Sequence, residues 1–440
     1  MLILNLLMLA LAWIIFFTII SFTIIKKNKK DLIIKLKLWY LASCFLFIIG
    51  GLSLIEYLIF GDTNITNRWT LAVLSEENIY LFSSLWFISA IFFVIGVILS
   101  NSFQRFISGW NNYQIINFYD LNKVTYISFV LTLLSAIYEN HFTLLKTERV
   151  KNMWINYELG FTRIDLPYKD IFMVYFALFL IWLDVKQKQK DFNKYLQIIF
   201  VITFIVFSIL QGDRLIAIEI WLIWLIFNSW KNKGIKLKAF ISQCILIVCI
   251  SIIFYSFRLI LLSLFLNNQL ILFPVNYKRI LSLLQADVGG HMYVTIKIYK
   301  ELWQFPFDQL LCGSALLTTI INIIPRIINP WKSHTITYLF NLAYFGDIYK
   351  GGGLFMNIVS DGILNFGKYF FFIQSFLLGF FIGLFDFLSF SKNLFNLVLY
   401  MSCASIVIYA TIDNLGAFLQ VIIFRSIILL LIVVFSKLLK

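Results

Sequence analysis

Charged residues are scarce in this 440-residue sequence, at 13% of the chain, whereas hydrophobic residues make up 61%. Soluble globular domains carry roughly 25% charged residues, so the composition excludes an ordinary soluble protein. Short segments of alternating hydrophobicity, typical of transmembrane β-strands, are also absent. The chain instead contains apolar runs of about 20 residues, the length of a helix that crosses a bilayer. Because a helix satisfies its own backbone hydrogen bonds in lipid, the sequence predicts an all-α, polytopic transmembrane bundle.

Cysteine and histidine are scarce as well. The five cysteines form no CxxC pair and no disulfide framework. Of the three histidines, neither His291 nor His334 has a second histidine at metal-ligand spacing. No internal repeat is evident, so the usual sequence indication of an inverted-repeat transporter is missing. These absences predict a protein without a metal site or a cofactor.

The apolar runs predict about eleven spans within one transmembrane domain, residues 1–440. The expected spans are 2–25, 39–60, 79–100, 124–140, 170–184, 195–210, 215–230, 239–260, 369–390, 394–411 and 418–436. The first run is long and is followed by no small-residue cleavage site. We therefore expect a retained span there and not a signal peptide.

Lysine residues cluster between these spans, at 26–37, 186–194, 231–238 and 436–440. The positive-inside rule places such segments in the cytoplasm, and all four fall on one side if the first span runs from outside to inside. The net charge of +14 is then explained by topology and anionic lipid, and not by nucleic acid. Two outer loops follow from this topology, 141–169 and 262–367, and the second contains apolar pieces such as "QLLCGSALLTTIINII".

Arginine is distributed differently from lysine, which outnumbers it 27 to 9. Arg105 alone lies in a predicted cytoplasmic loop, and Arg425 lies inside the last expected span. The others fall on or near the outer side: Arg68, Arg149, Arg163, Arg214, Arg258, Arg279 and Arg326. A guanidinium group binds phosphate or carboxylate with two parallel hydrogen bonds. The set therefore predicts anion binding, with loop salt bridges as the alternative for any single member.

The turn "QGDR" is the whole connection between the sixth and seventh expected spans, so Asp213 and Arg214 lie at the outer membrane surface. Glu219 lies about 7 Å deeper, at 1.5 Å per residue. An ionisable group in the apolar phase is costly unless it is paired or faces a polar cavity. Glu219 is thus either part of a buried pair that joins two helices or the wall of a cavity for an anionic headgroup.

The long outer loop adds further candidates. Its basic and imidazole side chains are Lys278 and Arg279 in "NYKRI", and Arg326, Lys332 and His334 in "IIPRIINPWKSH". Gly351, Gly352 and Gly353 either let the backbone approach a headgroup closely or form a flexible turn. Asp361, just before an expected span, is either a helix cap or a general base.

These motifs together resemble the O-antigen polymerase family, the Wzy-type oligosaccharide repeat unit polymerases, as do the length, the number of spans and their aromatic richness. Members commonly carry a Gly-x-Arg outer turn between two middle spans, similar to "QGDRL". Their long outer loop has a Pro-Arg and Pro-x-Lys neighbourhood, similar to "IIPRIINPWKSH". It ends in an acidic, glycine-bearing segment, here "SDGILNFG", where Asp361 replaces the more common glutamate. The resemblance covers residues 195–390.

The resemblance implies a GT-C-like, metal-independent glycosyltransferase at the outer, periplasmic face of the inner membrane, with short helices in its long outer loop. Its substrates would be oligosaccharide repeat units on undecaprenyl pyrophosphate, and a chain-length regulator would be a further partner. Arg214 and Arg326 would clasp the pyrophosphate, assisted by Arg279 and Lys332. Asp361 or His334 would be the general base, and Asp213, Glu219 and Gly351, Gly352 and Gly353 would support the site.

Two other classes stay open at this point. An O-antigen ligase would share the architecture and transfer finished polymer to the lipid A core. A repeat-unit flippase or other transporter would place charged residues or broken helices through the bilayer midplane, whereas most candidates here cluster toward the outer face.

Overall fold

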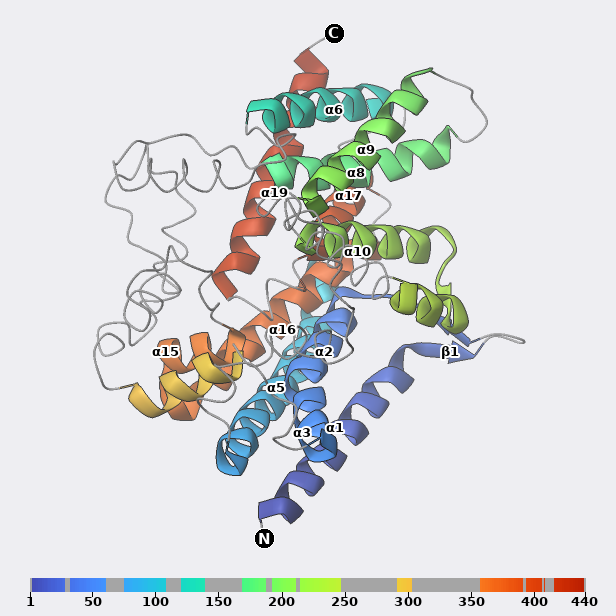
Figure 1. Ribbon diagram of the computed structural model, residues 1–440. Coiled ribbons are helices and arrows are strands. Elements are labelled where there is room, and N and C mark those ends of the chain that lie inside the picture. Colours follow the sequence, from blue (N-terminus) through green and yellow to red (C-terminus); the bar gives the residue numbers. More distant parts are fainter. Residues whose placement is uncertain are drawn as a thin grey trace, which may run out of the picture.

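The computed structural model describes most of the predicted spans. The described residues are 2–27, 32–60, 75–107, 120–138, 168–186, 192–210, 214–246, 291–302, 357–390, 393–405, 407 and 415–438. They form an all-α membrane bundle with one short sheet (Figure 1). Within these ranges, six helices are long and apolar enough to cross a membrane: Leu2–Thr23, Leu38–Ile55, Glu76–Phe103, Leu121–Tyr138, Phe372–Ser389 and Phe418–Leu438. The coarse sequence prediction of a helical membrane protein is therefore confirmed.

The main helices fall on the expected spans, except α15, which lies mostly in the expected outer loop 262–367. They are α1 (Leu2–Ile24), α2 (Leu38–Phe47), α3 (Ser53–Phe60), α5 (Glu76–Ile107), α6 (Leu121–Tyr138), α8 (Tyr168–Val185), α9 (Phe192–Leu210), α10 (Arg214–Lys231), α15 (Ile358–Phe370), α16 (Phe372–Asp386), α17 (Leu394–Ser402) and α19 (Leu415–Leu438). A π-helical segment, Ile48–Leu52, joins α2 to α3, and 3-10 turns follow α16 and α17 at Phe387–Phe390 and Cys403–Ser405. Helical residues also cover 237–246 and 291–301.

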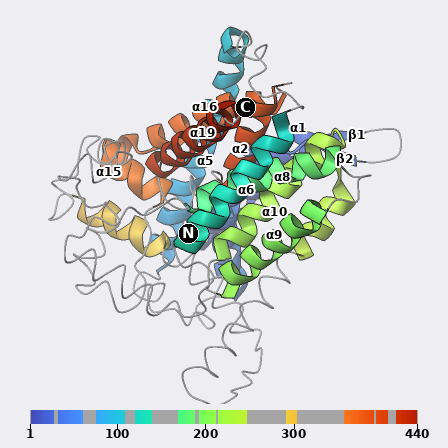
Figure 2. The same cartoon turned by 90° about the horizontal axis from the view of Figure 1, so that it is seen from above.

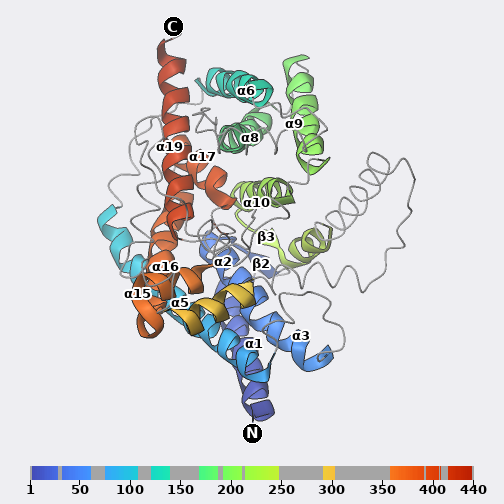
Figure 3. The same cartoon turned by 60° about the vertical axis from the view of Figure 1, so that its left-hand side comes forward.

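Helices α6, α8, α9 and α10 lie side by side in one part of the bundle (Figure 2). Helix α19 runs beside α17 and reaches α8, so the end of the chain packs against its middle (Figure 3). Helices α1 and α19 each present an exposed apolar face, for example Leu4 and Met8 on the first and Leu431 and Phe435 on the second. Such surface would promote association in water, whereas in a bilayer it contacts acyl chains.

The closest helix pair is α5 and α16, which pack in parallel. Gly379 lies against the backbone of Phe93, and Gly383 lies against Val97 and Ser100 one turn further along both helices. On the other side of the contact, Gly96 lies against the backbone of Phe376. Small residues at such spacing let two membrane helices approach closely, where van der Waals packing holds them together. The parallel direction agrees with the alternation of the expected spans.

Two of the four lysine-rich segments meet in a short sheet that the sequence did not predict, whereas the end of α19 lies away from it (Figure 3). Strand β1 (Ile25–Lys27) pairs antiparallel with β2 (Leu32–Ile34), which pairs antiparallel with β3 (Ile235–Lys236). The sheet joins segment 26–37 to segment 231–238. An ion pair between Lys231 Nζ and Asp184 brings the end of α8, just before segment 186–194, to the same place. We call this place the lysine-rich end.

A buried carboxylate fixes the start of α2 at the lysine-rich end. Asp386 Oδ1 accepts hydrogen bonds from Leu38 N at 2.7 Å and from Tyr400 Oη at 2.6 Å, and Asp386 Oδ2 accepts one from Trp39 N at 3.0 Å. The first N–H groups of a helix have no partner within the helix, and a carboxylate satisfies them well. Asp386 thereby joins the last turn of α16 to the first turn of α2 and to α17.

Replacing Gly379 with leucine is expected to lower the stability of the bundle. A Cβ at this position would overlap Phe93 O, and a backbone atom cannot move aside as a side chain can. Forcing extra atoms into a packed contact typically costs about 1–3 kcal/mol, so the Tm of the purified protein in detergent should fall. Phe381→Leu, at an exposed position of the same helix, is the control. Equal Tm values for Gly379→Leu and wild type would contradict the close α5–α16 contact.

Candidate functional site

Arg425 is the most deeply buried ionisable residue of α19, with only 2% of its side chain exposed. It lies ten residues from the start of the helix, about 15 Å along the axis at 1.5 Å per residue. A charged side chain within a membrane protein is costly unless other groups pair with it. The partners of Arg425 therefore decide whether this position is stable.

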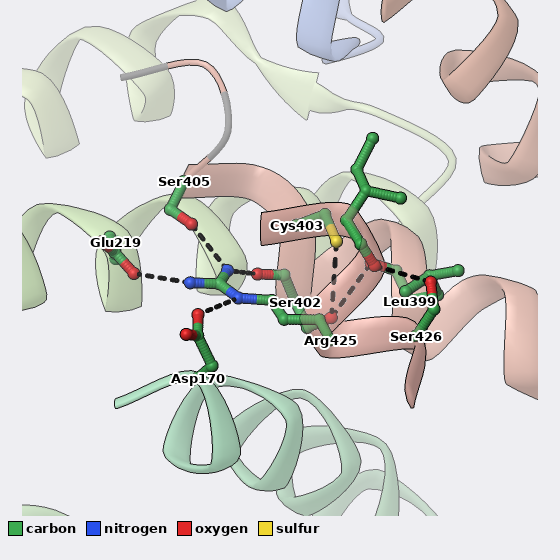
Figure 4. A network of polar contacts seen from close by, with 9 residues as sticks. Asp170, Glu219, Leu399, Ser402, Cys403, Ser405, Arg425 and Ser426 are labelled. Atoms are coloured by element: carbon green, nitrogen blue, oxygen red, sulfur yellow. Dashed lines mark hydrogen bonds and ion pairs between the residues drawn. The ribbon is translucent and has the colours of Figure 1, made fainter. Parts of the chain in front are cut away.

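The guanidinium group contacts four residues (Figure 4). Nε donates to Asp170 Oδ1 at 2.8 Å, and Nη2 donates to Glu219 Oε2 at 3.3 Å. Nη1 donates to Ser405 Oγ at 2.6 Å and also to the backbone oxygen of Ser402. We call these five residues the Arg425 cluster.

Each partner comes from a helix terminus that suits it. Asp170 lies in the first turn of α8 and Glu219 in the second turn of α10, where the helix dipole favours negative charge. Ser402 ends α17, and the last carbonyl groups of a helix have no partner within the helix. Arg425 satisfies one of them. A single side chain of α19 thus connects α8, α10 and α17.

The cluster nearly uses up the hydrogen-bonding capacity of the arginine. A guanidinium has five N–H donors, and four of them are directed at the residues just named. Glu219 is also buried, with 4% of its side chain exposed, whereas Asp170 keeps 23% exposed. The hydrogen bonds of Arg425 therefore connect helices to each other and leave at most one N–H group for a substrate phosphate.

A second polar group joins α15 to α16 and to the helix at 291–301, and we call it the α15 cluster. Asn357 caps α15, since its side chain accepts from Val359 N and Ser360 N, and Ser360 Oγ accepts from Asn357 N in return. Asn357 Nδ2 donates to Thr295 Oγ1 at 3.0 Å and to His291 O at 3.3 Å. This reciprocal capping fixes the first turn of α15.

Asp361 lies one turn after Asn357 and is buried. Gln374 Nε2, from the first turn of α16, donates to Asp361 Oδ2. Helix α15 is kinked at Gly367, which adopts φ 78° inside the helix, and Gly362 lies against Phe371 O, so that a Cβ would overlap it. Backbone geometry that only glycine adopts freely therefore places Asp361 beside Gln374.

His291 contributes no positive charge to the α15 cluster. Burial lowers the pKa of its imidazole to about 4, because the apolar surroundings disfavour the charged form. At neutral pH the ring is uncharged. Its Nδ1 atom is buried and makes no hydrogen bond in the described part of the chain.

Only three of the residues predicted for the site fall within the described ranges. Arg214 is the first residue of α10, and its side chain lies outside what the structure describes. Glu219 takes the first of its two predicted roles, a buried pair that joins helices. Asp361 is not the cap of α15, because Asn357 fills that position. The remaining candidates lie outside the described residues: Asp213, Arg279, Arg326, Lys332, His334, Gly351, Gly352 and Gly353.

Part of the Arg425 cluster is indicated by the sequence. Arg425 stands out as an arginine inside an expected span, and such a residue requires an acidic partner. Glu219 was identified as one acid in the apolar phase, but Asp170 at the first turn of α8 was missed. Nothing in the sequence order of residues 170, 219 and 425 indicates that they meet.

Within the described ranges, no group of three or more histidine, cysteine, aspartate or glutamate side chains is placed to hold a metal ion. The ion pairs of the Arg425 cluster and the hydrogen bonds of the α15 cluster instead connect protein groups to each other.

Three comparisons with known proteins found no match. No protein-family model matches the sequence, no curated protein matches it, and no solved structure matches its fold. The functional argument therefore depends on the residues and their placement.

Replacing Arg425 with methionine is expected to destabilise the protein strongly, because it leaves Glu219 buried without its cation. Breaking a buried ion pair by removing one partner costs about 3–5 kcal/mol, so the Tm in detergent should fall well below that of wild type. The triple variant Asp170→Asn, Glu219→Gln, Arg425→Met should recover much of this loss, since no charge remains buried.

Lys437→Met removes a cation at an exposed position of the same helix and serves as the control. If Arg425→Met keeps the wild-type Tm, or if the triple variant is no more stable than Arg425→Met, the ion pairs of the cluster do not stabilise the bundle.

Proposed function

We propose that this protein polymerises oligosaccharide repeat units carried on undecaprenyl pyrophosphate, at the outer face of the inner membrane, to form O-antigen or capsule-type polysaccharide. The observation that carries the proposal is the position of "QGDRL". Arg214 begins α10, and five residues later Glu219 enters the buried Arg425 cluster. Arg214, the arginine of "QGDRL", thus begins a helix that is connected through Glu219 and Arg425 to α8, α17 and α19.

The distribution of charge supports an outward-facing site. The lysine-rich end gathers the C-terminal ends of α1, α8, α10 and α16, and the positive-inside rule assigns such an end to the cytoplasm. Asp170 and Glu219 lie near the opposite ends of α8 and α10. Arg214 begins α10 at that same end. A site built there would face the periplasm, where repeat units on their lipid carrier are joined.

The proposed reaction is a displacement at an anomeric carbon. A hydroxyl oxygen of the acceptor sugar forms the new bond to the anomeric carbon of the growing chain, while the bond to the pyrophosphate oxygen breaks. The hydroxyl proton passes to a base, and undecaprenyl pyrophosphate leaves with the electron pair. Negative charge develops on the leaving group, so cations fixed beforehand stabilise the transition state more than the ground state.

Arg214 and Arg326 clasp the pyrophosphate in this proposal, with Arg279 and Lys332 assisting. A guanidinium matches two phosphate oxygens at once. Asp213 orients Arg214, and Gly351, Gly352 and Gly353 let the backbone approach the headgroup. The chemistry proposed here uses these protein cations and requires no metal or cofactor.

The base in this proposal is Asp361 or His334. Asp361 sits in the first turn of α15 with its carboxylate fixed by Gln374, and a base must be held within reach of the proton that it takes. The hydrogen bond from Gln374 fixes the Asp361 carboxylate, and this supports Asp361 as the candidate base among the described residues.

The proposal extends to the finer architecture and to the partners. We assign about eleven spans in a GT-C-like arrangement, with the outer loops 141–169 and 262–367 surrounding the site. The undecaprenyl-pyrophosphate-linked oligosaccharide is the substrate, and a chain-length regulator is a partner in the same membrane.

Deleting the gene in its native host is expected to leave surface polysaccharide as a single repeat unit, because units still reach the outer face but are not joined. Gel analysis of the polysaccharide measures this directly. Polymer accumulating on the undecaprenyl carrier would instead identify a ligase. Loss of outward delivery with polymerase activity intact would identify a flippase.

Arg214→Lys, returned to the deletion strain, is expected to collapse the product to single repeat units. The ammonium keeps the charge but loses the two-point contact with phosphate. Arg105→Lys, at the cytoplasmic end of α5 in the proposed topology, should leave polymer length unchanged. Immunoblotting of the membrane fraction checks that both variants accumulate equally. Long polymer from Arg214→Lys would rule out its proposed role.

A further inference from the structure

The side-chain amide of Gln374 uses its nitrogen and leaves its oxygen without a partner. Gln374 is fully buried in the first turn of α16. Its Nε2 donates to Asp361 Oδ2, whereas Oε1 accepts no hydrogen bond from any described residue. Buried polar atoms nearly always have a partner, because a buried carbonyl oxygen without a donor costs free energy. Gln374 Oε1 therefore requires an explanation.

The orientation of this amide follows from its partner. An ionised carboxylate only accepts hydrogen bonds, so the amide must present its N–H side to Asp361. Turning the amide round would place two acceptors against each other. Oε1 and Nε2 are bonded to the same carbon, which places them about 2.3 Å apart. The Gln374 oxygen and the Asp361 carboxylate are thus two neighbouring hydrogen-bond acceptors.

The capping of α15 is complete without Gln374 Oε1. The Asn357 side chain accepts from the first turn of α15 and donates to Thr295 and to His291 O. Asp361 N donates to Asn357 O at 2.8 Å. These groups satisfy each other, and none of them supplies a donor to the amide oxygen. A hydroxyl group of a bound molecule would supply it.

Close packing fixes the two acceptors relative to each other. Gly362 follows Asp361 and lies against α16, where a Cβ would be 3.1 Å from Gln374 Cβ and would overlap Phe371 O. A larger residue at position 362 would push α15 away from α16. The glycine thus lets Gln374 reach the carboxylate. Groups that are fixed in this way bind a ligand with a smaller loss of entropy.

The two acceptors lie toward the outer face in the proposed topology. Asp386, in the last turn of α16, contacts the lysine-rich end, which the positive-inside rule assigns to the cytoplasm. Gln374 lies twelve residues earlier in the same helix, about 18 Å along its axis. It is therefore on the side of the membrane where sugar units are joined in the proposed function.

We propose that Gln374 Oε1 accepts a hydrogen bond from the acceptor sugar, at a hydroxyl group adjacent to the one whose proton passes to Asp361. Adjacent hydroxyl groups of a sugar ring are two donors held side by side, and they match two acceptors held side by side. The N–H side of Gln374 orients the carboxylate. Its oxygen favours acceptor sugars with a free hydroxyl beside the reacting one. This inference rests on the polymerase function proposed above, with Asp361 as its base.

The test measures sugar transfer by the full-length protein in lipid nanodiscs, with undecaprenyl-pyrophosphate-linked repeat units as substrates. A series of acceptors lacks one hydroxyl group of the terminal sugar at a time, and mass spectrometry measures each product. Wild type should use the acceptor without the adjacent hydroxyl with a kcat/KM about tenfold lower, the effect of one lost hydrogen bond. Gln374→Met should have the same kcat/KM for this acceptor as for the complete one.

Two variants control for the loss of a buried polar group. Ser375→Ala removes a hydroxyl beside Gln374 in the sequence, on the face of α16 where Gly379 meets α5. Gln243→Met removes another amide oxygen without a hydrogen bond to any described residue, in the helical segment 237–246. Both variants should discriminate between the acceptors as wild type does.

Gln374→Glu gives a second readout that depends on pH. A protonated carboxyl group resembles the amide, with one donor and one acceptor oxygen, so at low pH this variant should discriminate as wild type does. As the pH rises, the introduced carboxyl group ionises and repels Asp361. The kcat/KM of the variant relative to wild type should therefore fall.

Three results would overturn the proposal. The first is equal discrimination by wild type and Gln374→Met. The second is wild type using every acceptor of the series equally well, since Oε1 would then contact no sugar hydroxyl. In both, transfer to the complete acceptor shows that the polymerase function itself stands. The third is no transfer by wild type to the complete acceptor, which would overturn the polymerase function and this inference together.

Discussion

The buried guanidinium of Arg425 is the interaction on which the arrangement of the second half of the bundle depends. Its partners lie on α8, on α10, at the end of α17 and in the turn that follows α17. Asp170 and Glu219 offer carboxylates near the N-terminal ends of their helices. Ser402 offers a backbone oxygen that has no partner within its own helix. In a membrane, apolar side chains gain little by leaving lipid for each other. A network of ion pairs and hydrogen bonds therefore specifies which helices meet and at what depth.

Different parts of the bundle are held together by different polar contacts. At the lysine-rich end, the sheet and the Asp386 carboxylate join segments that are far apart in the sequence. Near the N-terminal ends of α8 and α10, Asp170 and Glu219 pair with Arg425. Helices α5 and α16 are joined by glycine contacts without charge.

Sequence reasoning predicted the elements better than the contacts between them. Most of the described helices fall on the expected spans because the apolar runs and their lengths are local properties of the chain, whereas α15 lies mostly in the expected outer loop. Glu219 was recognised as an acid whose burial costs free energy unless it is paired. A buried pair joining two helices was one of its two predicted roles. Asp170 was missed because an acid at the first turn of a helix is common and carries no local sign of a distant partner. The β-sheet was also missed, because a lysine-rich connection between two helices usually predicts a solvated loop.

The sequence by itself determined that the protein is a helical membrane protein, where most of its apolar helices lie and which segments carry the positive charge, because hydropathy and lysine clustering act over neighbouring residues. Only the tertiary structure decided that Arg425 meets Asp170 and Glu219, that Asn357 and not Asp361 caps α15, and that Ile33 and Ile34 pair with residues 235 and 236 in one sheet. These outcomes depend on which helices pack together, and packing among apolar helices is set by a few polar groups and glycines whose partners are hundreds of residues away.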